Sequence, residues 1–218
     1  MEPLLAFAAA LIAFRLAGSL ARRWRDSGRP QLAAWSASLL AYALASGALA
    51  WGAAAGWNEA AFRVYYTCGG LLTAALLGTG SLLLWGCRWA GPVGLVYTGL
   101  AIGVGIGAPL TRAIGGDSIP DAQDHLELFP ARLLAIVGNS AGTLAVVGVA
   151  LLTIRRRPLG NALILAGVAA AGAGSAVAGL GVAETAGFVA LGAFLLYLGI
   201  LAQGKNFVRD RLIRQHPG

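Results

Sequence analysis

The apolar run at residues 133–154 constrains this chain most strongly. It contains no charged residue, follows an acidic segment that ends at Glu127, and stops at the basic triplet Arg155-Arg156-Arg157. A helix of about 20 apolar residues spans the hydrocarbon region of a bilayer, because each residue adds about 1.5 Å. Since positive loops stay on the cytoplasmic side, the flanking charges also predict that this helix runs from outside to inside.

The composition supports the same class for the whole chain. Of 218 residues, 58% are hydrophobic and 11% are charged, and the mean hydropathy is +0.73. Soluble domains carry about 25% charged residues, so the composition argues against a soluble globular protein. The net charge of +7 is spread over short loops between apolar runs, which indicates membrane topology and not nucleic-acid binding. A single lysine among the basic residues, with abundant Gly and Ala, is typical of a GC-rich bacterial genome, so the expected location is a bacterial cytoplasmic membrane.

Seven apolar runs are long enough to cross a bilayer as helices. They cover residues 4–21, 32–55, 62–85, 91–110, 133–154, 159–180 and 186–201. With the N-terminus outside, the inner side holds thirteen of the sixteen basic residues and two acids, Asp26 and Asp210, a net of +11. The outer side then holds three basic residues and seven acids, a net of −4. The sequence therefore predicts an all-α polytopic membrane protein with seven transmembrane helices, N-out and C-in.

A repeated pattern suggests an internal duplication. Arg29-Pro30 opens the second run and Arg157-Pro158 opens the sixth, and each pair is followed by a glutamate in the next outer turn. Within a transmembrane domain at 1–204, the predicted repeats are 1–88 and 130–204, with a linker helix at 91–110. Residues 205–218 form a basic cytoplasmic tail. Chance similarity among bilayer helices with basic inner loops is the alternative.

This three-plus-one-plus-three layout resembles the SWEET and PQ-loop carriers of sugars and amino acids. The chain is also similar to uncharacterised bacterial seven-helix membrane proteins. The resemblance covers the topology of the whole chain and implies a carrier for a small solute. Those carriers place a proline–glutamine pair within a membrane helix as a hinge, whereas Pro30-Gln31 stands here at a loop-to-helix junction and its counterpart is Pro158-Leu159.

Polar side chains share helical faces in the expected outer half of three runs. The faces comprise Arg63, Tyr66, Gly70 and Thr73, then Arg132, Asn139 and Thr143, and finally Ser38, Tyr42 and Ser46. If the faces converge, they form a cleft with two arginines at its mouth, which suits a small polar or anionic solute because guanidinium groups bind carboxylate and phosphate. The candidate ligand-binding residues are Arg63, Tyr66, Thr73, Arg132, Asn139, Thr143 and Tyr42. Alternatively, the hydroxyl and amide groups bond the backbone or neighbouring helices, and the arginines pair with Glu59, Glu127 and Glu184.

Glycine and other small residues predict close helix packing, because they let membrane helices approach. The fourth run has Gly99, Gly103 and Gly107 at a spacing of four, and the sixth has Ala171, Ser175 and Gly179. We expect these two helices to be the most enclosed. Hinges for gating are the alternative.

The interiors of the runs contain no Asp, Glu, His or Lys. Because intramembrane chemistry usually depends on such residues, we expect no catalytic residue, no cofactor and no metal. Cys68 and Cys87 lie near opposite ends of the third run, too far apart for a disulfide. Arg15 is the one charged residue well inside a run, where it either snorkels to the inner interface or binds an anion.

The segment between the fourth and fifth runs is acidic. It contains Asp117, Asp121, Asp124 and His125, whose spacing does not match an EF-hand loop. A hard cation needs six or more well-placed oxygen ligands. We therefore expect a solvated loop or lid.

The predicted function is a carrier or facilitator for a small polar or anionic solute. The alternative is a seven-helix sensor, or an accessory or structural subunit of a membrane complex. Its basic tail would contact a cytoplasmic partner or anionic lipid, and its glycine-rich faces would contact other subunits or further copies. The expected partners are thus the lipid bilayer, the solute and membrane proteins, but no nucleic acid.

Overall fold

The computed structural model describes residues 2–116, 118–155 and 158–176, together with 191–192, 194–195 and 198–199. Every named element in these ranges is helical. In chain order they are α1 (Glu2–Ser27), α2 (Pro30–Ala55), α3 (Glu59–Tyr65), η1 (Tyr66–Thr73), α4 (Ala74–Trp85), α5 (Ala90–Gly107), α6 (Ala122–His125), η2 (Leu128–Arg132), α7 (Leu133–Thr153) and α8 (Pro158–Ala176).

The first six predicted runs each coincide with helical structure, which confirms the all-α class for the described residues. The seventh, 186–201, lies mostly outside them, as do Glu184 and the tail at 205–218. Five helices are long and apolar enough to cross a membrane, and α8 adds a shorter apolar stretch. The five are Pro3–Ser27, Pro30–Ala55, Glu59–Trp85, Ala90–Gly107 and Leu128–Thr153.

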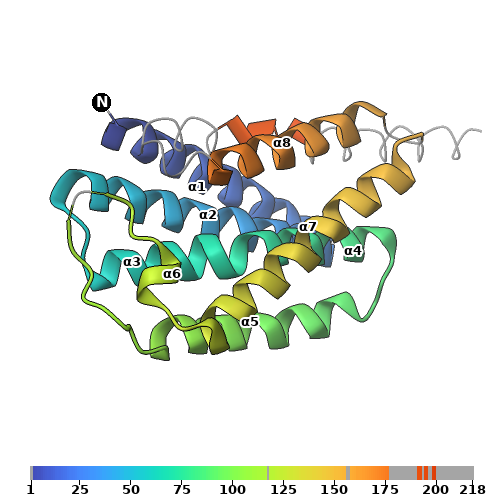
Figure 1. Cartoon of the computed structure of the whole chain (residues 1–218). Helices are drawn as coiled ribbons and strands as arrows, with labels where there is room; N and C mark the ends of the chain where they lie inside the picture. Colours follow the sequence, from blue (N-terminus) through green and yellow to red (C-terminus); the bar gives the residue numbers. More distant parts are fainter. Residues whose placement is uncertain are drawn as a thin grey trace, which may run out of the picture.

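The long helices run back and forth along the bundle (Figure 1). The helix α2 lies between α1 and the continuous rod formed by α3, η1 and α4, and α7 packs across α4. About half of the apolar span of α2 (50%) is buried, against 22% for α5. The helix α2 is therefore central, whereas α5 lies at the edge of the bundle.

Side-chain size varies along the bundle. The core at one end contains Trp57, Phe62 and Leu49, and the core at the other contains Leu20 and Trp35. Between them, a third cluster combines two leucines of η1 with alanines of α2, α5 and α7. Small residues therefore bring the helices together around η1.

Two glycines allow α4 and α7 to approach closely. A Cβ atom on Gly78 would lie 2.6 Å from the Cα atom of Gly142, and one on Gly142 would overlap the carbonyl of Ala74. Because no real side chain tolerates such distances, this crossing depends on the missing Cβ atoms.

The expectation that Gly99, Gly103 and Gly107 enclose the fourth helix is wrong. A Cβ atom added to any of these three would meet nothing within 4 Å. The helix α5 is buried instead through a second row of small residues, which includes Gly94, Ala101 and Gly105. Both rows have helical spacing, so the sequence alone does not distinguish the packed row from the open one. For the sixth helix, the side chains of the predicted row lie outside the described part of the chain.

We predict that Gly142→Ala lowers the thermal stability of the detergent-purified protein. The added methyl group overpacks the contact with α4, which typically costs about 1–3 kcal/mol. Gly148→Ala on the same helix is the matched control, because a Cβ atom there meets nothing within 4 Å. Thermal unfolding followed by tryptophan fluorescence measures both. Equal melting temperatures for the two variants would contradict the close crossing.

Candidate functional site

The third long rod changes its helical geometry in its middle. Residues Tyr66–Thr73 form the π-helix η1, between the α-helices α3 and α4. In a π-helix each hydrogen bond spans five residues, and π turns within α-helices frequently mark functional sites. The sequence predicts a helix here but gives no signal for the π turn.

Side chains from neighbouring helices bind the backbone of η1. The Asn139 side chain, on α7, donates from Nδ2 to the carbonyl oxygen of Gly70 at 2.8 Å. The Ser38 hydroxyl, on α2, donates to the carbonyl of Thr73 at 2.7 Å, and the Thr73 hydroxyl donates to the carbonyl of Cys68 at 2.7 Å. Three of the polar residues that the sequence pointed to thus meet at η1. Each donates a hydrogen bond to a backbone carbonyl there.

Tyr97, on α5, makes a further contact with η1 that the sequence reasoning missed. Its hydroxyl lies 2.9 Å from the carbonyl oxygen of Leu71 and 3.1 Å from that of Leu134, on α7. Gly138 makes room for the ring, because a Cβ atom there would overlap the tyrosine hydroxyl. A tyrosine in the middle of a mostly apolar run is the sequence signal for such a contact, because a buried hydroxyl usually finds a hydrogen-bond partner.

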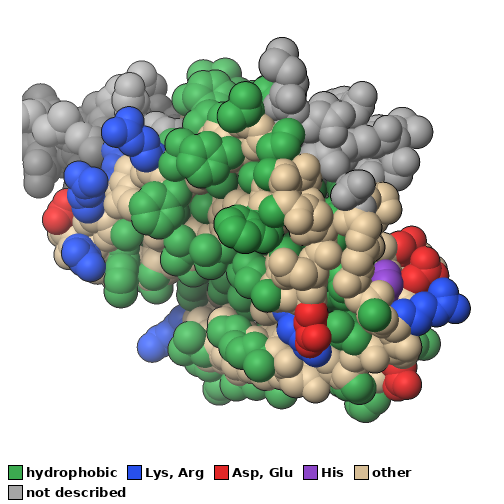
Figure 2. Space-filling view, turned by 90° about the vertical axis from the view of Figure 1, so that its left-hand side faces the viewer, with side chains coloured by type: hydrophobic (Ala, Val, Ile, Leu, Met, Phe, Trp, Pro, Cys, Tyr) green, Lys and Arg blue, Asp and Glu red, His purple; other side chains and the backbone are tan. Residues whose placement is uncertain are grey.

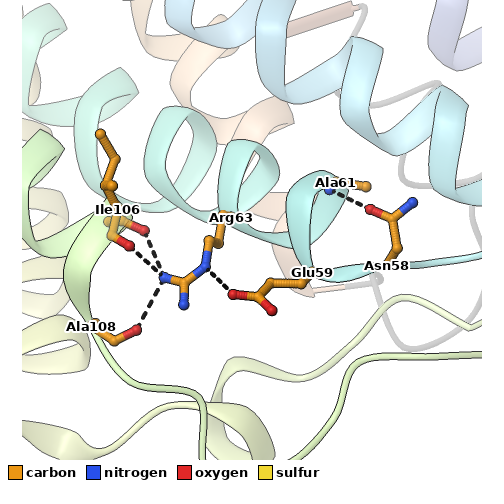
Figure 3. A network of polar contacts seen from close by, with 7 residues as sticks. Asn58, Glu59, Ala61, Arg63, Ile106 and Ala108 are labelled. Atoms are coloured by element: carbon orange, nitrogen blue, oxygen red, sulfur yellow. Dashed lines mark hydrogen bonds and ion pairs between the residues drawn. The ribbon is translucent and has the colours of Figure 1, made fainter.

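Arg63 joins α3 to the end of α5 (Figure 3). Its Nε donates to Glu59 Oε1 at 2.7 Å, and its Nη1 lies 3.2, 3.0 and 3.0 Å from the carbonyl oxygens of Gly105, Ile106 and Ala108. The last carbonyls of a helix lack backbone donors and carry partial negative charge, so a guanidinium stabilises them. The pairing with Glu59 matches one of the alternatives for this arginine, whereas the contact with α5 was not predicted.

Tyr66 lies beside a small cavity near Arg63. Its ring stacks on Phe62 with 5.9 Å between ring centres, and its hydroxyl is buried without a partner among the described residues. The cavity measures about 10 Å³, which is roughly the space for one water molecule. Its walls come from α3, η1, α5, η2 and the loop after α5; they are Phe62, Arg63, Tyr66, Val104, Gly105, Ala108, Leu110, Leu126 and Ala131.

Arg132 belongs to the same end of the bundle. It follows Ala131, which lines the cavity, and its charge lies within electrostatic range of the Tyr66 hydroxyl. The side chain is half-buried and forms no ion pair or hydrogen bond with a described residue. Arg63 and Tyr66 therefore line the cavity, and Arg132 directly follows one of its lining residues.

The remaining candidates lie elsewhere. Thr73 and Asn139 are at the backbone of η1, and Tyr42 is half-buried on α2. Thr143 is exposed on α7, one turn beyond Asn139. Arg15 is also exposed, on α1. The predicted outer cleft thus separates into a cavity at one end and a set of backbone contacts in the middle of the rod.

The acidic loop folds over the cavity end of the bundle. A short bridge pairs Leu110 with Leu126, and the Thr111 amide donates to the carbonyl of His125 at 3.0 Å. The Asp121 carboxylate accepts a hydrogen bond from the Gln123 amide at 2.9 Å and so caps α6. Within the described ranges, no group of three or more His, Cys, Asp or Glu side chains could hold a metal ion. Asp117 lies outside these ranges.

Comparison with protein-family models, with curated proteins and with solved structures finds no match for this chain. Two features of the structure itself bear on function. They are the π-helix with its side-chain donors, and the cavity that Arg63 and Tyr66 line.

We predict that Asn139→Ala loosens η1. Loss of the bond to the Gly70 carbonyl removes an interhelical contact, and such contacts contribute about 0.6 kcal/mol on average and up to about 1.7 kcal/mol. The variant is expected to melt at a lower temperature and to exchange its η1 amide hydrogens faster. Ser140→Ala, at an exposed neighbouring position of α7, is the control. Unchanged exchange in the Asn139 variant would show that this bond does not hold η1.

Proposed function

We propose that the chain is an integral membrane protein that acts as a carrier or facilitator for a small polar or anionic solute. Five long apolar helices support the membrane setting. Large apolar side chains are exposed along α5 and α7. Their exposure is unfavourable in water and favourable in contact with lipid tails. On the face in Figure 2, hydrophobic side chains cover the middle, and most charged side chains lie near the left and right margins.

Exposed tryptophans support the same setting. Trp24, Trp85 and Trp89 lie near the ends of α1 and α4 and just before α5, on the side that the charge distribution predicts to be cytoplasmic. Trp51 lies near the opposite end of α2. Tryptophan is enriched at both membrane–water interfaces. Orientation N-out and C-in, a bacterial cytoplasmic membrane and the duplicated SWEET-like layout belong to this proposal as predictions.

The carrier proposal rests mainly on the π-helix η1. Carriers commonly bind solutes where a membrane helix departs from regular α geometry near the middle of the bilayer. Here that departure occupies residues 66–73 of the rod Glu59–Trp85. Polar donors from α2, α5 and α7 meet there, although polar groups in a bilayer interior are costly.

The packing on each side of η1 suggests how such a carrier moves. The helix α4 is fixed to α7 by the contact between Gly78 and Gly142, whereas η1 is held by side-chain hydrogen bonds that can exchange partners. We propose that α3 tilts relative to α4 about η1. That movement would open a path from the cavity beside Tyr66 toward the middle of the bundle.

The two native cysteines test this proposal. Cys68 lies within η1, and Cys87 lies in the connection between α4 and α5. With Cys87→Ser, we predict that Cys68 reacts with a membrane-impermeant methanethiosulfonate reagent added outside intact cells, because a carrier admits water to η1. The matched variant Cys68→Ser should react through Cys87 only in inverted vesicles, which checks the orientation.

The result that overturns the carrier proposal is equally direct. Cys68 would resist the reagent from both sides of the membrane and react fully after denaturation, which would show that η1 is dry and packed. The alternative of a sensor or subunit depends on the basic tail at 205–218, which lies outside the described residues.

A further inference from the structure

We infer that the cavity beside Tyr66 is a binding site for a small monovalent anion. The bound anion inserts one acceptor atom of about the size of water, either a halide ion or one oxygen of a short monocarboxylate. This inference names the class of solute that the proposed carrier binds. Binding itself does not depend on the carrier proposal, whereas transport of the bound anion does.

The size of the cavity sets the size of the bound group. A volume of about 10 Å³ holds roughly one water-sized atom. The walls contributed by Phe62, Leu110, Leu126 and Ala131 are apolar, so they strengthen any electrostatic contact inside by excluding water. A polyhydroxylated sugar does not fit this space, whereas one carboxylate oxygen does.

Two polar side chains that line the cavity have donor groups left over, Tyr66 and Arg63. The Tyr66 hydroxyl is buried and has no partner among the described residues. The Nη2 group of Arg63 makes no hydrogen bond to a described residue, since the contacts of this side chain run through Nε and Nη1 (Figure 3). A hydroxyl and a guanidinium together suit an acceptor atom, and more strongly when that atom is charged.

The charges near the cavity also favour an anion over water. Glu59 pairs with Arg63, and no carboxylate of the described residues pairs with Arg132. Glu127, five residues before Arg132, is exposed and forms no ion pair with the described residues. One positive charge next to a half-buried tyrosine therefore remains for a ligand to neutralise.

Binding to the full-length protein in nanodiscs tests the site. Sodium chloride and sodium formate are titrated at constant ionic strength against sodium gluconate, and the shift in melting temperature gives the Kd of each anion. We expect a saturable shift. If only chloride saturates the shift, the site binds halide ions. If only formate does, the site binds carboxylates. If both do, the site accepts either kind of anion.

Variants locate the binding. Tyr66→Phe should raise Kd about fivefold, the equivalent of one hydrogen bond, and Arg132→Gln should raise it severalfold, because it removes a positive charge close to the cavity. Tyr65→Phe and Arg112→Gln, at a neighbouring tyrosine and an exposed arginine of the loop, should leave Kd unchanged. If Arg132→Gln does not fold, Arg132→Lys should still weaken binding, because lysine lacks the planar fork.

Two results overturn the site. One is the absence of a saturable shift with either anion in the unmodified protein, which means that the cavity holds only water. The other is an unchanged Kd in both Tyr66→Phe and Arg132→Gln, which places binding elsewhere. Anion flux into proteoliposomes made from the same preparation separates this site from the carrier proposal. If the anion binds but is not transported, the carrier proposal is overturned and the binding site stands. If the anion is transported without saturable binding, the binding site is overturned and the carrier proposal stands.

Discussion

The carbonyl groups of the π-helix η1 are the constraint on which the described bundle depends. A carbonyl oxygen has two lone pairs, so it can accept a side-chain hydrogen bond in addition to a bond within its own helix. Three carbonyls of η1 accept such bonds, from Ser38 on α2, Tyr97 on α5 and Asn139 on α7. These three bonds fix the rotation of three helices relative to one segment.

Small residues make these bonds geometrically possible. Lipid tails are as apolar as leucine, so burial of apolar surface does not drive membrane helices together, and close packing and polar contacts replace it. Gly138 gives the Tyr97 hydroxyl its place, and Gly142 lets α7 approach α4. Both glycines lie on the helix that carries Asn139. The close approach of α7 therefore brings Asn139 within hydrogen-bond distance of η1, and that bond in turn stabilises the approach.

The helices were predictable from the sequence because length, apolarity and charged loops act locally, and the first six runs match helices within a few residues. The candidate site was only partly predictable. Spacing alone suggests the pairing of Arg63 with Glu59, since residues four apart are neighbours on a helix. Its contact with the Ala108 carbonyl joins positions 45 residues apart, and no local pattern encodes that distance. The π turn has no local signal either, and the donors that bind its carbonyls come from helices distant in the sequence.

The contacts of Arg63 divide the bundle into two units. Its Nη1 binds the last carbonyls of α5 while its backbone belongs to α3, so a displacement of α3 carries the end of α5 with it. The helices α4 and α7 form the opposite unit, because their backbones meet directly at Gly78 and Gly142. Tyr97 bridges the two units, since its hydroxyl bonds Leu71 on η1 and Leu134 on α7. Asn139 also joins α7 to η1, so a movement of one unit against the other would exchange the hydrogen bonds of Tyr97 and Asn139 and could keep those of Arg63.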